Sequence, residues 1–527
     1  MPVLQETLSG TRAKIVVAML VITGLAVAVF VRMMNFDMRR DEQLYVPPAA
    51  LLPDLSLYTD YFYNHVPASA WLFHAFHAAL PSLGLLFAGR LAVFFFWLLF
   101  AGSVFAVVWM ISRSVMLAVF TVFALAANSL VLGPLGMSAT NNLIPLPLTL
   151  IGTALFIGGV EGRAGVRPLL IAAGGLFLGA AVSMKANAVC FIPAVSVASI
   201  LLPHGVPFIV RLRKVVLPLF AGGVVGGLPI LYYLARDPER FLAHVMGFHL
   251  GPHVAFWNSA GDENVVLGTG AKLQLSYDLW LDGSGTLVVL LFGTFALMML
   301  SAGNRRPVSA YGNGVLAMIA AQMAFAVAFS FLPTPSFPQY FSLPFAVWPL
   351  LLAIVFARLE PVQKNKLRGM LAVAAVLAAI LAAPRLVLDL PRLASPAKWD
   401  VVKIHRAGNE IAAQLAAAGV KGRVATMLPI YVLEGGGSVY PELATGQFIY
   451  RSADMTPPDL LAHYKTTSPS RIGDLLAGDP PAAILAGFEP ELEKPLLEFA
   501  RANDYRKVEG FSFTDRYGQA ELYVRRD

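Results

Sequence analysis

Long apolar runs recur through the first three quarters of this chain, and they constrain its fold more than any other feature. A helix needs roughly 20 apolar residues to cross a hydrocarbon core about 30 Å thick. The charged fraction, 13%, is about half the usual value, so we predict a polytopic α-helical membrane protein. The apolar runs predict about eleven spans, near residues 15–34, 86–110, 115–133, 143–160, 168–184, 187–203, 215–235, 286–302, 312–332, 341–357 and 369–386.

Basic residues cluster in the short segments between the predicted spans, for example at Arg113, Arg167 and Lys214. If the amino terminus is cytoplasmic, every such cluster falls on the cytoplasmic side, as the positive-inside rule requires. The net charge of +7 is therefore a topology signal and not the mark of a nucleic-acid partner. The same parity places loops 35–85 and 236–285 on the outer side of the membrane.

The composition changes near residue 387, where charge density rises and the apolar runs shorten to strand length. Short apolar strands that alternate with amphipathic helices predict a small α/β domain. We therefore divide the chain into a multi-spanning domain, 1–386, and a soluble extracytoplasmic domain, 387–527. The expected strands lie near 422–428 and 482–486, and the expected helices near 401–417 and 489–501.

Two adjacent acids, Asp41 and Glu42, follow the first predicted span and lie in the outward loop. Solvated acids are ordinary in such a loop, which is the simplest interpretation. Carboxylates beside a membrane are nevertheless costly to keep unless they bind or react. A transfer reaction needs a carboxylate within hydrogen-bond reach of the acceptor to take its proton. We predict Asp41 as that base, with Glu42 orienting the acceptor or sharing the role.

A single lysine, Lys185, interrupts an apolar stretch that runs from 168 to 203. As one helix this stretch would measure about 54 Å at 1.5 Å per residue, so it must fold back, and Lys185 lies at the turn. A lysine that snorkels from a helix end would explain the residue equally well. The alternative is a cation that binds a lipid phosphate. Gln339 and Tyr340 enter a later span from the same side and are candidates for contact with a phosphate or sugar, although the neighbouring prolines alone explain a bend there.

Loop 236–285 carries His244, His249 and His253, together with Asp262 and Glu263. Gly251 and Pro252 break the helix that a metal pair at positions 249 and 253 would need. We therefore predict no metal ligands and assign the loop to an interfacial flap. No cofactor is expected with certainty, and a divalent metal stays an open alternative.

The order of these motifs resembles the GT-C superfamily of membrane glycosyltransferases, in particular the lipid A aminoarabinose transferases and the protein O-mannosyltransferases. The resemblance covers most of residues 10–386. It rests on Asp41-Glu42 with Tyr45, on Leu57-Tyr58-x-Asp60 leading to His65-x-Pro67, on Gly174-Gly-Leu-x-x-Gly179 leading to Lys185, and on Gln339-Tyr340-x-x-x-Pro344.

The resemblance implies a polyprenyl-phosphate-sugar donor, used at the outer face of the cytoplasmic membrane. It implies that Asp41 is the catalytic or acceptor-orienting acid and that Lys185 and Tyr340 hold the donor phosphate. It also implies substrate contacts for Tyr58, Asp60 and His65. Many relatives carry a second acid before the fourth span, where this chain has Asn141 and Asn142; amides bind a sugar but cannot act as a base.

Three functions remain open at this point. A glycosyltransferase acting on lipid A, a lipopolysaccharide core, another envelope glycan or a protein fits the outward acids best. A transporter or flippase of a lipid-linked saccharide predicts charged or broken helices near the midplane. The predicted spans hold almost no ionisable residues apart from Arg90 and Lys185. Another polyprenyl-linked transferase, such as a polymerase or ligase, is the third alternative.

Overall fold

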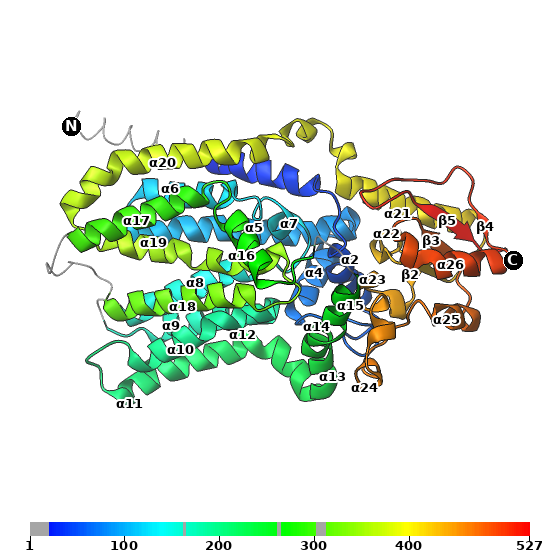
Figure 1. The fold of residues 1–527 in the computed structure, drawn as a ribbon, viewed down its shortest axis with the longest axis horizontal. Helices are drawn as coiled ribbons and strands as arrows, with labels where there is room; N and C mark the ends of the chain where they lie inside the picture. The colour runs from blue at the N-terminus through cyan, green and yellow to red at the C-terminus, as the bar shows by residue number, and fades with distance from the viewer. Residues whose placement is uncertain (1–19, 162–164, 261–264, 302–311, 527) are drawn as a thin grey trace.

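The computed structural model describes residues 20–161, 165–260, 265–301 and 312–526. A helical bundle occupies one end of the molecule and a small sheet domain the other (Figure 1). Asp262 and Glu263 lie outside the described residues, as do the first residues of the first predicted span.

Five helices of the described chain are long and apolar enough to cross a membrane, or six if one bent pair forms a single span. The five are Leu85–Ser112 (α5), Phe208–Arg236 (α11, η3 and α12), Asn313–Phe331 (α18), Pro338–Ala357 (η5 and α19) and Pro361–Val387 (α20). The bent pair is Thr269–Trp280 (α16) and Gly285–Ser301 (α17), which meet at 84°.

Shorter apolar helices occupy the other predicted spans, so a multi-pass helical membrane protein is confirmed, while the count of eleven stays a prediction. These helices are Leu20–Met34, Val115–Ala127 (α6), Pro145–Val160 (α8), Pro168–Met184 (α9) and Ala186–Leu201, which comprises η2 (Ala186–Phe191) and α10 (Ile192–Leu201). The span expected at 115–133 is wrong at its end, because Asn128 leaves the helical conformation. Its side chain instead accepts a hydrogen bond from Leu130 N and donates one to Leu279 O.

Helices α9 and α12 (Leu217–Arg236) pack backbone to backbone along a stripe of glycines. A Cβ atom on Gly175 would lie 2.1 Å from the carbonyl oxygen of Leu219, and one on Gly179 would lie 2.3 Å from that of Gly223. Only glycine permits this approach, which brings helices closer together than larger side chains allow. The glycines of the Gly174–Gly179 motif thus set the helix spacing below Lys185.

The carboxy-terminal part contains a five-stranded mixed sheet in the order β2-β1-β3-β5-β4. Strand β1 (Arg423–Thr426) is parallel to β2 (Ser438–Val439) and β3 (Ala483–Ala486), whereas β5 (Glu521–Val524) is antiparallel to β3 and to β4 (Arg506–Lys507). Helices α21 (Asp400–Ala417), α22 (Pro429–Glu434) and α26 (Pro490–Ala502) accompany the sheet. The predicted strands and helices of this region are confirmed; its place outside the cytoplasm stays a prediction.

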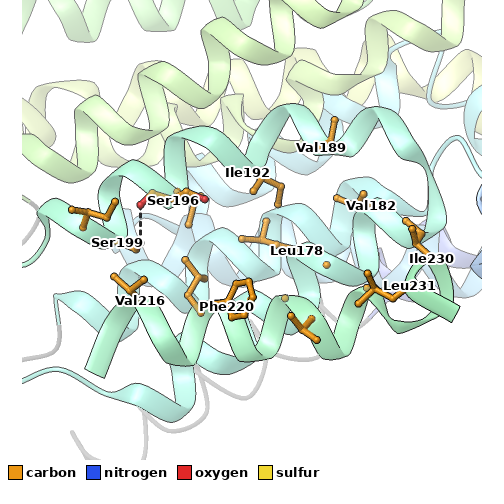
Figure 2. A pocket seen from close by; sticks show the side chains of 18 residues that line it. Leu178, Val182, Val189, Ile192, Ser196, Ser199, Val216, Phe220, Ile230 and Leu231 are labelled. Carbon is orange, nitrogen blue, oxygen red and sulfur yellow. Dashed lines mark hydrogen bonds between the residues drawn. The ribbon is translucent and has the colours of Figure 1, made fainter. Parts of the chain in front are cut away.

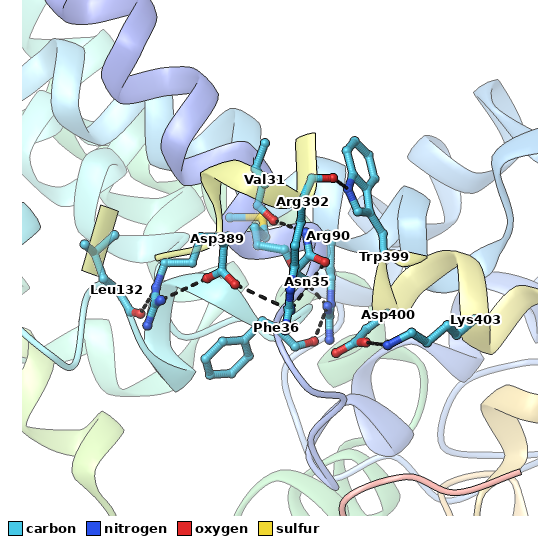
Figure 3. A network of polar contacts seen from close by, with 12 residues as sticks. Val31, Asn35, Phe36, Arg90, Leu132, Asp389, Arg392, Trp399, Asp400 and Lys403 are labelled. Atoms are coloured by element: carbon cyan, nitrogen blue, oxygen red, sulfur yellow. Dashed lines mark hydrogen bonds and ion pairs between the residues drawn. The ribbon is translucent and has the colours of Figure 1, made fainter. Parts of the chain in front are cut away.

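Ion pairs join the end of α20 to the first apolar helix (Figure 3). Arg32 donates to Asp389 Oδ2 at 3.1 Å and to the carbonyl oxygen of Leu132 at 2.9 Å. Arg392 pairs with the other oxygen of Asp389 at 3.4 Å. These contacts fix the chain where it leaves the bundle for the sheet domain.

Candidate functional site

The segment from Met38 to Tyr45 lies between the bundle and the sheet domain, where it begins the short helix α2 (Glu42–Tyr45; Figure 1). Glu42 is fully buried and forms a two-pronged ion pair with Arg90 of α5, with both N–O distances 3.0 Å. Its oxygens also accept hydrogen bonds from Ala139 N at 2.7 Å and Arg39 N at 2.8 Å. Protein donors thus occupy the whole Glu42 carboxylate, which anchors the segment to the bundle.

Asp41 differs from its neighbour in every one of these respects. Its side chain is partly exposed and accepts no hydrogen bond from the residues that the structure describes. Burial raises the pKa of Asp41, and the positive charges of Lys185 and Arg451 oppose that rise. A carboxylate that is free, accessible and more basic than usual is suited to accept a proton.

Lys185 lies at the fold-back between α9 and η2, as the length of the apolar run predicted. Its backbone is extended, which ends α9, and its ammonium group donates to Asn142 Oδ1 and lies 5.8 Å from the ring centre of Tyr340. Asn141 donates to the carbonyl oxygen of Met184 at 2.8 Å. Four of the predicted site residues, Asn141, Asn142, Lys185 and Tyr340, therefore meet in one cluster, and the charge of Lys185 acts on Asp41.

Stacked rings form another wall of the site. The rings of Tyr45 and His65 are parallel with centres 4.5 Å apart, and His249 lies 5.6 Å from His65. Burial holds the pKa of His65 well below its usual value, so this ring is neutral. His249 Nε2 lies 2.9 Å from the carbonyl oxygen of Asn64 and donates to it. Within the described ranges no three His, Cys, Asp or Glu side chains are grouped to hold a metal ion.

Two of the remaining predicted residues, Asp60 and Tyr58, have local hydrogen-bond partners, and Gln339 has none in the described part of the chain. Asp60 accepts a hydrogen bond from Ser56 N at 2.7 Å, within its own turn. Tyr58, in a left-handed conformation with φ 69°, donates to the carbonyl oxygen of His65 at 2.6 Å. Gln339 precedes Tyr340 on η5 (Pro338–Ala346), and its side chain forms no hydrogen bond to the described part of the chain. No hydrogen bond joins Tyr58, Asp60 or Gln339 to Asp41 within the described chain, although Tyr58 orients the loop that carries His65.

The sheet domain also contacts the segment that carries Asp41. The guanidinium of Arg40 pairs with both oxygens of Glu489, and Arg40 N donates to Tyr517 Oη at 2.9 Å. Gln43 Oε1 accepts a hydrogen bond from Ile430 N at 2.9 Å. Sequence reasoning missed these partners because it treated the region after residue 387 as a separate domain.

Arg451 is a candidate site residue that the sequence did not indicate. It directly follows α23 (Gln447–Tyr450), and its guanidinium lies over the rings of Phe256 and Trp257 of α15 (Pro252–Ala260), at 4.6 and 4.7 Å. Burial lowers the pKa of Arg451 to about 10, which leaves it charged at neutral pH. Its charge acts on Asp41 from the sheet domain.

An apolar groove of about 450 Å³ runs along the bundle between α9, α10 and α12 (Figure 2). Leucine, isoleucine, valine and phenylalanine side chains line most of it, with Ser196 and Ser199 at one end. At the other end Val182 and Val189 line it, three residues before and four residues after Lys185. This end of the groove therefore lies near the turn between α9 and η2 that carries Lys185.

No family model and no curated protein matches this sequence. Among solved structures, the chain is similar to ArnT from Cupriavidus metallidurans bound to undecaprenyl phosphate, with a TM-score of 0.60, 15% identity, and 96% of this chain and 97% of that one covered. The apo state of the same protein gives a TM-score of 0.59 at 16% identity, with 98% of each chain covered. The Archaeoglobus fulgidus oligosaccharyltransferase gives 0.47 at 11% identity, covering 96% of this chain and 74% of that one. The fold expected from the resemblance to GT-C membrane glycosyltransferases is confirmed: over nearly its whole length, this chain has the fold of ArnT.

Proposed function

We propose that this chain is a glycosyltransferase that moves a sugar from a polyprenyl-phosphate donor to a cell-envelope acceptor at the outer face of the cytoplasmic membrane. The observation that carries the proposal is the carboxylate of Asp41, which accepts no hydrogen bond from any described residue, beside the cluster of Lys185, Asn142 and Tyr340. A base and a cation within one site are what a sugar transfer from a lipid phosphate requires.

The groove beside Lys185 supports a lipid-linked donor. The part of α12 that lines it, from Leu219 to Leu231, extends roughly 18 Å at 1.5 Å per residue, enough for several isoprene units. Isoprene units in the groove place a phosphate at its Lys185 end. ArnT, which shares the fold, was solved with undecaprenyl phosphate bound.

In the proposed reaction the acceptor's hydroxyl or amine attacks the anomeric carbon of the sugar while Asp41 removes its proton. The bond between the anomeric carbon and the phosphate oxygen breaks, and both electrons leave with the phosphate. Lys185 neutralises that growing charge, and the Tyr340 hydroxyl donates to the same oxygens. Glu42 is the anchor that fixes Asp41 and is not a second base, since Arg90 and backbone donors hold its carboxylate.

The test is mass spectrometry of envelope glycolipids and glycans from a strain that lacks the gene, complemented at matched levels. Wild type restores one discrete sugar mass, and Asp41→Asn leaves that mass absent. Asp54→Asn, which alters an exposed acid of the same loop, restores it. Restoration by Asp41→Asn contradicts the mechanism; accumulation of an intact lipid-linked saccharide without loss of a single sugar supports transport instead.

A further inference from the structure

Arg451 is a cation without a carboxylate partner in the described chain. Its guanidinium lies against the faces of Phe256 and Trp257, and the ring of Phe448 lies 5.5 Å away. Stacking occupies the face of a guanidinium but leaves its in-plane N–H donors available for a planar or tetrahedral oxyanion. The site therefore contains preoriented donors whose partner is not among the described residues.

Among the described residues, positive charges around Asp41 outnumber negative ones. Glu42 is matched by Arg90, and Arg40 by Glu489. What remains is Lys185, Arg451 and Arg39 against Asp41. In a partly buried site an unbalanced cation is costly, and a bound anion offsets that cost.

The two cations come from different parts of the fold. Lys185 lies at the turn between α9 and η2, and its ammonium group donates to Asn142 of the bundle. Arg451 follows α23 of the sheet domain, and its guanidinium lies over the rings of Phe256 and Trp257. The proposed function assigns the donor phosphate to Lys185, which leaves Arg451 without an assigned ligand.

We propose that Arg451 binds an oxyanion, a phosphate or a carboxylate, carried by the acceptor. This inference rests on the proposed sugar transfer and narrows it to acceptors with an anionic group next to the accepting hydroxyl or amine. In a direct displacement the acceptor and the leaving phosphate lie on opposite sides of the anomeric carbon, so each needs a cation of its own: Lys185 for the phosphate and Arg451 for the acceptor. Arg451 is then a specificity residue that the sheet domain supplies to the site.

A purely structural role would make Arg451 a clamp that holds α15 against the sheet domain through its aromatic contacts. If Arg451 has only this structural role, its substitution lowers stability and weakens the binding of donor and acceptor together. If Arg451 binds the acceptor, its substitution weakens acceptor binding and leaves donor binding unchanged.

The experiment uses the full chain in two assays. The first measures binding of undecaprenyl phosphate to purified wild type, Arg451→Gln, Arg451→Lys, Lys185→Gln and the control Arg501→Gln, whose residue is exposed on α26. The second expresses the same variants in the deletion strain. Envelope glycolipids are separated by anion exchange into retained and unretained fractions, and sugar additions in each are quantified by mass spectrometry.

The expected result is a wild-type sugar addition in the retained, anionic fraction. Arg451→Gln reduces that addition roughly 10- to 100-fold, the value of a lost charge-assisted hydrogen bond, with undecaprenyl phosphate binding unchanged. Arg451→Lys recovers part of the addition because it keeps the charge, and Arg501→Gln behaves as wild type. Lys185→Gln, in contrast to Arg451→Gln, loses the binding of undecaprenyl phosphate.

Three results overturn the inference. In the first, wild type modifies only the unretained fraction, which leaves the proposed transfer intact. In the second, Arg451→Gln loses undecaprenyl phosphate binding as Lys185→Gln does, which assigns Arg451 to the donor. In the third, Arg451→Gln transfers as well as wild type. If wild type adds sugar to neither fraction, the proposed transfer fails, and this inference with it.

Discussion

The neighbours Asp41 and Glu42 are expected to respond to substitution in opposite ways. Glu42→Gln removes one member of a fully buried ion pair and leaves Arg90 without a counter-charge. The carboxylate accepts four hydrogen bonds, whereas a carboxamide oxygen has two lone pairs and its amino group would face donors. An uncompensated buried charge costs about 3 to 5 kcal/mol, and we expect a loss of that size.

Equilibrium unfolding in mixed detergent micelles, followed by tryptophan fluorescence, measures this loss. Asp41→Asn should change the free energy of unfolding by less than about 1 kcal/mol, because the Asp41 carboxylate has no partner to lose among the described residues. The double variant Glu42→Gln/Arg90→Gln should cost less than the sum of its single changes by at least about 1 kcal/mol, since the two residues are in contact. A cost below about 1 kcal/mol for Glu42→Gln, or equal costs for Glu42→Gln and Asp41→Asn, would refute the division of roles.

Two further predictions concern the framework around the site. Gly179→Ala places a Cβ atom 2.3 Å from the carbonyl oxygen of Gly223 and should cost about 1 to 3 kcal/mol, whereas a Cβ on Gly227 meets nothing within 4 Å and Gly227→Ala should be near neutral; equal unfolding free energies for the two would contradict the packing. The hydrogen bond from His405 to Glu434 raises the pKa of His405, so its stabilisation is complete below the ordinary pKa of roughly 6.5 and is lost as pH rises through the higher folded value. The melting temperatures of wild type and His405→Ala should accordingly differ most in acid and converge in alkali; a difference independent of pH would exclude this ion pair as the cause.

The sequence predicted those parts of the site that depend on the length of an apolar run or on the order of residues and spans along the chain. The apolar run from 168 to 203 is too long for one span, so Lys185 had to lie at a turn, and the structure has the turn there. The position of Asp41 after the first span and of Tyr340 before a later one placed both on the same side. The strands near 422–428 and 482–486 followed from their short apolar runs.

The rest depended on contacts between distant parts of the chain. Nothing near Arg90 in sequence indicates that it pairs with Glu42, and an arginine at the edge of a span is ordinary. Arg451 and Glu489 lie in a domain whose composition indicates a soluble unit, yet Glu489 pairs with Arg40 beside Asp41 and the charge of Arg451 acts on Asp41. Such residues are visible only when the fold brings the sheet domain against α2 and α15 (Figure 1).

The central claim is that Asp41 assists transfer of a sugar from a polyprenyl phosphate. Its most direct test is to incubate the purified chain in detergent with total lipid from the deletion strain, which contains both donor and unmodified acceptor. In detergent no compartments exist, so transport leaves every lipid unchanged. We expect wild type to add one sugar mass to an acceptor and to release polyprenyl phosphate in equal molar amount, and Asp41→Asn to do neither. Unchanged lipids with wild type, or equal turnover with Asp41→Asn, would contradict the central claim.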